Sequence, residues 1–179
     1  TVRDPYSHRL LTDLGMEVPL LLCTATWAGR YYGLSKTSDE YVAIVPPDPR
    51  SIHPPSVGLH TRKDVEQFVQ GRVFNLARGF EQTGKKPVVV CHTYGEVGLF
   101  QELFPTFCSN DPVAMLRFYS RCETVVSARL HACLPAYGLG VKRVVSVPID
   151  TRGSAASHFG ISEVHLQDLS YDTVQAALE

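Results

Sequence analysis

Short apolar runs alternate with amphipathic stretches along most of this chain. Pro87–Cys91 is a continuous β-branched run, typical of a strand buried on both faces of a parallel sheet. Between residues 63 and 82 apolar side chains recur every three or four positions, which predicts a helix capped by Thr61 and ended by Gly84. The same reasoning predicts further strands at 18–24, 41–45, 106–108, 124–127, 143–147 and 164–166, and further helices at 4–15, 96–103, 112–121, 129–138, 152–159 and 171–178.

Alternating strands and helices of this length predict an α/β fold. We expect a doubly wound, mainly parallel sheet with helices on both faces, similar to a Rossmann fold. Two loops interrupt the pattern, one at 28–40 and a proline-rich one at 46–60. A chain of 179 residues fits one domain, so residues 1–179 are expected to form a single α/β lobe. Because the chain opens on Thr1 without a methionine, we also expect it to be one lobe of a longer protein.

Composition narrows the compartment and the partners. Seventeen basic residues oppose eighteen acidic ones, so neither nucleic acid nor an anionic membrane surface is an expected partner. The longest apolar stretch, Val18–Ala28, is too short to span a bilayer. None of the five cysteines forms a CxxC pair, and Cys23, Cys91 and Cys133 lie among apolar residues. These cysteines are therefore expected to be reduced and buried, which favours a cytoplasmic location.

The carboxyl ends of the predicted strands are where candidate chemistry is expected. In a doubly wound sheet, ligands bind in the crevice beyond these ends. No P-loop, GxGxxG, HExxH, GxSxG or EF-hand pattern is present in the sequence. Four segments follow predicted strands, namely His92–Gly95, Ser109–Asp111, Ser127–His131 and Pro148–Gly153.

The segment Ser127–His131 is the most informative of the four. An apolar run stops at two small residues, and Arg129 and His131 then fall in the expected first turn of a helix. A helix N-terminus presents unpaired N–H groups and the positive end of the helix dipole. With a guanidinium and an imidazole added, the turn suits an anion such as a carboxylate or phosphate. The alternative is structural: Arg129 pairs with a nearby aspartate, and His131 is a helix-end histidine.

Other charged residues lie close to this turn in the predicted fold. Asp150 and Arg152 bracket the turn after strand 143–147, and either a helix cap or a site role is open for them. Arg3 precedes the first helix and has no evident structural role, whereas its neighbour Asp4 suits a helix cap. His92 begins a loop that contains glycines. This loop either lets a ligand approach the backbone closely or is a plain turn.

Several motifs together resemble the polysaccharide pyruvyl transferase family. The resemblance extends from residue 2 to about 161, although residues 20–60 match poorly and Cys23–Thr26 stands where the family often has an aspartate. Its most specific part is the arginine-leucine-histidine motif after a strand. The matching segments are Val2–Ser7, Leu10–Gly15, Phe118–Ala132, which contains Arg129-Leu130-His131, Ala136–Val141, Asp150 with Arg152, and, loosely, Phe159-Gly160-Ile161.

This resemblance implies a fold, a reaction and a set of site residues. It implies the C-terminal, donor-binding lobe of a GT-B-like protein, inactive without its N-terminal lobe. The enzyme would move pyruvate from phosphoenolpyruvate onto two sugar hydroxyls as a ketal, in cell-surface or extracellular polysaccharide biosynthesis. Phosphoenolpyruvate is then the donor substrate, a saccharide is the acceptor, and neither cofactor nor metal is required. The resemblance assigns phosphoenolpyruvate binding to Arg3, Arg129, Leu130 and His131 and catalysis to Arg129 and His131, with Ser127, Asp150, Arg152 and His92 as further candidates.

Two other functions stay open at this point. The chain would also fit the lobe of a GT-B-type nucleotide-sugar glycosyltransferase or epimerase, although no acidic residue after a glycine-rich turn is placed to bind a ribose. A non-catalytic lobe for binding or assembly is the third hypothesis, and the presence of Arg3, Arg129 and His131 together argues against it. If the source is eukaryotic, the secretory-pathway lumen replaces the cytoplasm as the expected location.

Overall fold

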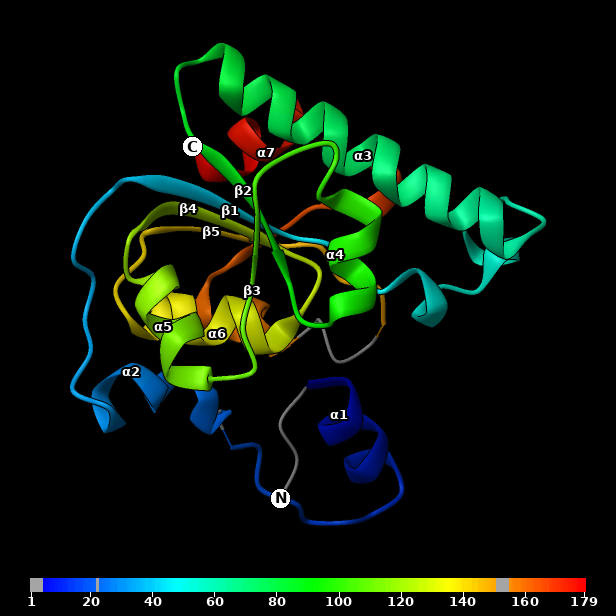
Figure 1. Cartoon of the computed structure of the whole chain (residues 1–179). Helices are drawn as coiled ribbons and strands as arrows, with labels where there is room; N and C mark the ends of the chain where they lie inside the picture. The colour runs from blue at the N-terminus through cyan, green and yellow to red at the C-terminus, as the bar shows by residue number, and fades with distance from the viewer. Residues whose placement is uncertain (1–4, 22, 151–154) are drawn as a thin grey trace.

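In the computed structural model, which describes residues 5–21, 23–150 and 155–179, the strands form one parallel sheet (Figure 1). The order of its six described strands is β3-β2-β1-β4-β5-β6. The predicted doubly wound α/β class is therefore confirmed. The strands are β1 (Tyr41–Val45), β2 (Pro87–Cys91), β3 (Thr106–Cys108), β4 (Cys122–Ser127), β5 (Arg143–Ser146) and β6 (Ser162–Glu163).

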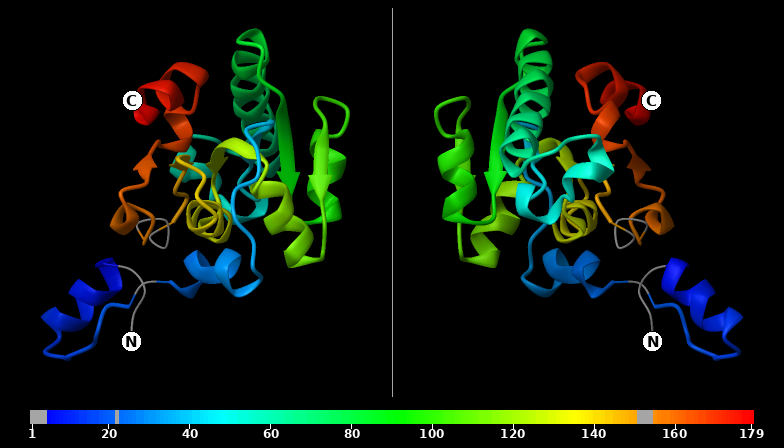
Figure 2. Two further views of the ribbon diagram at one scale, coloured as in Figure 1. Left: turned by 90° about the vertical axis from the view of Figure 1, so that its left-hand side faces the viewer. Right: turned by 90° about the vertical axis from the view of Figure 1, so that its right-hand side faces the viewer.

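Helices cover both faces of the sheet, as Figure 2 shows from two sides. One apolar core joins the sheet to α3 (Arg62–Gln82), α4 (Tyr94–Phe100) and α7 (Tyr171–Leu178). The other joins it to α5 (Pro112–Tyr119) and α6 (Leu130–Gly138). The central strands carry apolar side chains toward both cores, which explains their continuous β-branched runs. The remaining helical elements are α1 (Pro5–Asp13), α2 (Ala28–Tyr31), η1 (Thr24–Trp27), η2 (Pro49–Ser51), η3 (Pro54–Val57), η5 (Ser157–Phe159) and η6 (Leu166–Asp168).

The N-terminal part of the chain is where the sequence prediction fails. Residues 18–24 were predicted to be a strand, but their described part forms only an isolated bridge at Leu20 before η1 begins at Thr24. Pro19 removes a ladder hydrogen bond, and η1 instead packs beside α6. The short helix α2 also interrupts the loop predicted at 28–40.

The C-terminal part departs from the prediction in smaller ways. The strand predicted near 164–166 lies earlier, as β6, and Leu166 already begins the 3-10 turn η6. The helix predicted at 152–159 falls partly outside the described residues, and its described end is the 3-10 turn η5. The five cysteines are all free, and only Cys108 is not fully buried, as the reduced-thiol prediction requires.

Gly138, at the end of α6, permits the close approach of η1. A Cβ added at Gly138 would lie 1.7 Å from the carbonyl oxygen of Thr26, which is backbone and cannot turn aside. We therefore expect Gly138→Ala to lower the free energy of unfolding by about 2–3 kcal/mol, as overpacking does. Gly71→Ala, within α3 and with open space around it, is the control and should raise stability by about 0.5–1 kcal/mol. Urea denaturation of both variants tests this, and equal stabilities would contradict it.

The strand order fixes where a ligand can bind. Chain connections leave the central strands β1 and β4 in opposite directions, toward β2 and β3 on one side and β5 and β6 on the other. At such a topological switch point the carboxyl ends of the strands border a crevice that helices do not cover. The loops that follow β1, β2, β4 and β5 therefore converge there.

Candidate functional site

A cavity of about 280 Å³ lies at this switch point. Each of the four central strands contributes to its wall. The lining residues are Asp48 and Ser51 after β1, His92 after β2, Ala128, Arg129, Leu130 and His131 after β4, and Ser146, Pro148, Ile149 and Asp150 from β5 onward.

The turn between β4 and α6 is held by backbone and hydroxyl contacts. The buried Ser127 hydroxyl accepts a hydrogen bond from the Arg129 N–H (2.9 Å) and donates one to the Arg129 carbonyl (3.0 Å). The Ala128 N–H donates to the Val45 carbonyl across the switch point, at 3.0 Å. Arg129 is extended and is the N-cap residue, so α6 begins at Leu130, one residue later than predicted. The Ser127 hydroxyl thus stabilises the backbone of this turn.

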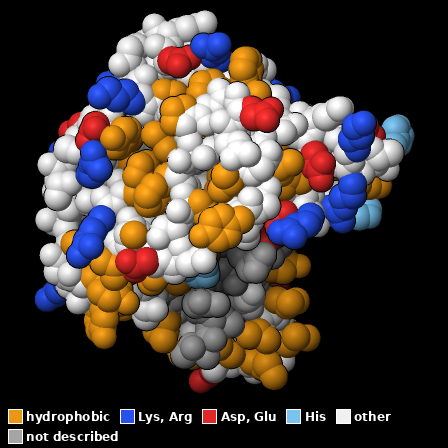
Figure 3. Space-filling view, in the orientation of Figure 1, with side chains coloured by type: hydrophobic (Ala, Val, Ile, Leu, Met, Phe, Trp, Pro, Cys, Tyr) orange, Lys and Arg blue, Asp and Glu red, His pale blue; other side chains and the backbone are white. Residues whose placement is uncertain are grey.

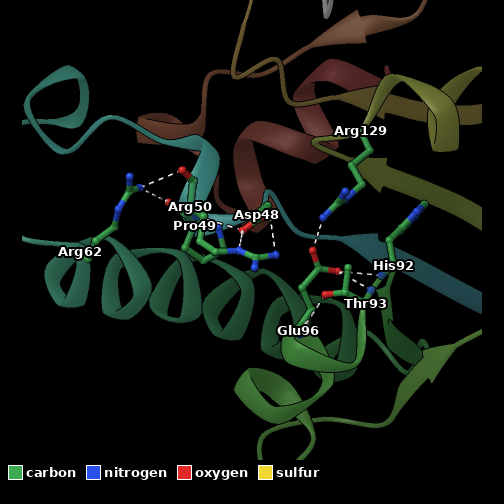
Figure 4. Close-up of polar contacts among 8 residues, drawn as sticks. All are labelled: Asp48, Pro49, Arg50, Arg62, His92, Thr93, Glu96 and Arg129. Carbon is green, nitrogen blue, oxygen red and sulfur yellow. Dashed lines mark hydrogen bonds and ion pairs between the residues drawn. The ribbon is translucent and has the colours of Figure 1, made fainter.

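The Arg129 guanidinium crosses the crevice to a carboxylate. Its Nη2 forms an ion pair with Oε1 of Glu96 in the first turn of α4, as Figure 4 shows. The Glu96 residue is only 3% exposed, whereas the Arg129 side chain is 27% exposed. The Arg129 Nε has no hydrogen-bond partner among the described residues. The structural alternative for Arg129 therefore holds in part, with a glutamate as partner instead of an aspartate.

The capping box at the start of α4 holds the Glu96 side chain in place. Its Oε2 accepts hydrogen bonds from the N–H groups of His92 (2.7 Å) and Thr93 (3.3 Å). In return the Thr93 hydroxyl accepts from the Glu96 N–H, which closes a capping box at the start of α4.

The proline-rich loop after β1 presents a second carboxylate to the cavity. Arg50 binds Asp48 through two hydrogen bonds of 3.0 Å and keeps the pKa of the Asp48 carboxyl below its usual range. Arg62 on α3 donates from Nη1 to the carbonyls of Pro49 (3.0 Å), Arg50 (3.0 Å) and Ile52 (2.8 Å). Figure 4 shows this loop fastened to α3 beside the Arg129–Glu96 pair. In the described residues, carboxylates therefore offset the guanidinium charge of the cavity.

His92 is half-buried at the end of β2. Burial, aided by the Arg129 charge, lowers its pKa from the usual 6.5 to about 4, so the imidazole is neutral at pH 7. Its Nε2 lies 3.4 Å from the Tyr119 hydroxyl, a hydrogen bond in which either group can donate.

The lowered pKa of His92 predicts a loss of stability in acid. Between pH 6.5 and about 4 the unfolded chain binds a proton that the folded protein does not, so stability falls as the pH drops. Allowing for the partial exposure of His92, we expect its contribution to be about 1–2 kcal/mol over this window. Denaturation of His92→Gln at pH 7 and pH 4.5, with the exposed His165→Gln as control, measures it. An unchanged slope in His92→Gln would contradict the prediction.

A neighbouring cavity of about 420 Å³ shares His92 and His131 with the first. Its wall includes Ser109 and Asn110, so the segment after β3 borders this second cavity. Asp111, from the same segment, is the N-cap of α5 and accepts a hydrogen bond from the Val113 N–H at 2.8 Å. His131 is exposed, and its Nε2 lies 3.9 Å from the buried Cys23 sulfur.

The structure brings most of the predicted site residues together. Arg129, Leu130, His131, His92 and Asp150 line one cavity, and the buried Ser127 supports it. Arg3 and Arg152 lie outside the described residues, so their roles stay predictions.

Sequence reasoning missed two acidic residues, Asp48 and Glu96. Asp48 follows a predicted strand, but it stands among prolines, which by themselves indicate only a surface loop. Glu96 stands three positions after Thr93, which is the spacing of a capping box and places an acid in a first turn at the sheet edge. Both signals were present in the sequence.

Two features are absent from the described part of the chain. It contains no group of three or more histidine, cysteine, aspartate or glutamate side chains placed to hold a metal ion. None of its helices combines the length and the apolar character that crossing a membrane requires. The cytoplasmic location stays a prediction.

Comparisons with known proteins agree on a family and a fold. The model of the polysaccharide pyruvyl transferase family matches residues 1–147. No curated protein sequence gave a match. Among solved structures, the E. coli heptosyltransferase WaaC with ADP is similar, with a TM-score of 0.58 and 15% identity over 93% of this chain and 52% of that one. The match with the glycotransferase of kitacinnamycin covers 79% of this chain and 34% of that protein, with 16% identity and a TM-score of 0.45. The chain thus spans about half the length of the heptosyltransferase, and the likeness between the two is one of fold.

Proposed function

Because the chain belongs to the polysaccharide pyruvyl transferase family, we propose that it is the donor-binding lobe of a two-lobed transferase that takes pyruvate from phosphoenolpyruvate. The acceptor is a saccharide, and two of its hydroxyls become bridged by a ketal. The observation that carries this proposal is the position of Arg129, Leu130 and His131 together on one cavity at the topological switch point.

The chemistry of phosphoenolpyruvate suits these side chains. Its carboxylate and phosphate match the planar donor array of a guanidinium, and Glu96 takes a hydrogen bond from only the Nη2 group of Arg129. His131 in the first turn of α6 is exposed to the crevice, where an imidazolium can donate a proton. The N-terminus of α6 adds the positive end of its dipole.

The proposed reaction adds one proton to the donor and releases phosphate. His131 protonates the methylene carbon while the first sugar oxygen bonds to the central carbon and loses its own proton. The second sugar oxygen then bonds to the same carbon as the carbon–oxygen bond to phosphate breaks. The proton of the second hydroxyl leaves with the phosphate, and the first returns to His131. The products are inorganic phosphate and the cyclic ketal.

Two features support a donor site that is completed by groups outside the described residues. Carboxylates already offset the charges of Arg129 and Arg50, so a multiply charged donor needs further cations, for which Arg3 and Arg152 are the candidates. The space-filling view in Figure 3 also shows apolar side chains gathered on α1. Tyr6 and Leu10 of α1 and Leu14 directly after it are 58%, 50% and 68% exposed, as expected of a surface that packs against a second lobe.

Phosphorus NMR of the whole gene product tests the proposed reaction. The protein is incubated with phosphoenolpyruvate and a panel of hexose and N-acetylhexosamine glycosides, and in parallel with nucleotide sugars. We expect the phosphoenolpyruvate signal to be replaced by inorganic phosphate only when an acceptor is present. Release of a nucleoside diphosphate from a nucleotide sugar, with no consumption of phosphoenolpyruvate, would overturn the proposal in favour of a glycosyltransferase.

A further inference from the structure

We propose that Glu96 is a positioning residue for Arg129. Its carboxylate holds the guanidinium in one orientation across the crevice. This inference rests on the proposed function, because it assigns Glu96 to the same donor site. Glu96 acts through Arg129 and is not itself a catalytic residue.

The first argument is topological. One oxygen of Glu96 accepts from the N–H groups at the end of β2, and the other binds Arg129 at the end of β4. These two strands are not neighbours, since β1 lies between them. A single carboxylate therefore spans the carboxyl end of β1 at the switch point, where a ligand is expected. Figure 4 shows the Arg129 side chain extending toward Glu96 over this gap.

The second argument is that helix capping does not account for the burial of Glu96. The chain uses the same motif at the start of α3, where Asp64 accepts from the Thr61 N–H at 2.9 Å and remains half-buried. Glu96 is only 3% exposed, and a buried carboxylate is unfavourable unless it is paired. Pairing with Arg129 therefore accounts for the burial of the Glu96 carboxylate. This ion pair joins the carboxyl ends of β2 and β4.

The third argument concerns what such a pair does to an anion site. Glu96 offsets the charge of Arg129, which weakens the attraction of an anionic donor in its ground state. Glu96 also restricts the flexible Arg129 side chain to one direction, which aligns the bound donor. Such alignment stabilises the transition state more than it strengthens binding of the donor. Removing Glu96 should therefore slow the reaction without weakening donor binding.

Glu96→Gln in the whole gene product tests this proposal, with Asp64→Asn as the matched control. Both changes remove one carboxylate charge from the N3 position of a capping box, but of these two carboxylates only that of Glu96 forms an ion pair with Arg129. For Glu96→Gln we expect kcat to fall at least 10-fold while the Kd for phosphoenolpyruvate stays equal or decreases. Glu96→Asp, which keeps the charge on a shorter side chain, should recover part of kcat. Asp64→Asn should leave both constants unchanged.

Arginine side-chain NMR gives a readout that does not depend on the donor. A guanidinium held by a buried carboxylate rotates slowly, so distinct Nη signals are expected for Arg129 in the wild type and in Asp64→Asn. They should merge in Glu96→Gln. If the signals are unaffected by Glu96→Gln, or if kcat is unchanged in that variant, the positioning role is overturned. If phosphoenolpyruvate is not consumed by the wild type, the proposed function fails, and the NMR result alone decides whether Glu96 fixes Arg129.

Discussion

Replacing Arg129 with methionine is expected to lower the free energy of unfolding by about 2–3 kcal/mol and to abolish binding of phosphoenolpyruvate. The reason for the first effect is the partner that remains. Glu96 is almost fully buried, and without the guanidinium its negative charge is uncompensated within the crevice. Breaking a buried pair costs about 3–5 kcal/mol, and the partial exposure of Arg129 reduces that figure.

Urea denaturation at pH 7 measures the change, with Arg50→Met as its matched control. Arg50 also pairs with a carboxylate of the same cavity, but its side chain is 72% exposed, so its loss should lower stability far less than the loss of Arg129. The double variant Arg129→Met/Glu96→Gln should recover at least part of the lost stability, since no buried charge is left unpaired. Equal losses in Arg129→Met and Arg50→Met would contradict this account of the pair.

Replacing His131 with alanine is expected to lower kcat by about 10²–10⁴-fold, the usual contribution of a general acid. The residue is exposed in the first turn of α6 and belongs to neither apolar core, so stability should change by no more than about 0.5 kcal/mol. Phosphoenolpyruvate should still bind, because Arg129 and the N-terminus of α6 remain.

Single-turnover kinetics of the whole gene product separate the role of His131 in chemistry from one in binding. His165→Ala, also an exposed histidine, is the control and should behave as the wild type. Turnover at the normal rate in His131→Ala would eliminate the general-acid role. A large loss of stability in the same variant would instead show that His131 is structural.

The sequence predicted the sheet well because its central strands have a simple, continuous apolar pattern. A strand covered on both faces, such as β2, is apolar throughout, and a short run of this kind is easily recognised in a sequence. Residues 18–24 imitate this pattern but contain Pro19, and only the packing of η1 beside α6 settles their conformation. Local composition carries no information about that tertiary contact.

The site was predicted in part for a similar reason. Arg129 and His131 stand in one short segment, so their common location follows from a single strand-to-helix turn. The tie between Arg129 and Glu96 joins residues 33 positions apart, and it depends on β1 lying between β2 and β4. Strand order is a property of the whole fold, which is why the capping motif alone did not reveal the partner of Arg129.

Calorimetric titration with phosphoenolpyruvate tests the central claim most directly, with UDP, ADP and a UDP-sugar as comparators. The donor site proposed here predicts binding of one phosphoenolpyruvate per chain, lost in Arg129→Met and retained in His131→Ala. Binding of a nucleotide together with silence toward phosphoenolpyruvate, measured on the whole gene product, would contradict it.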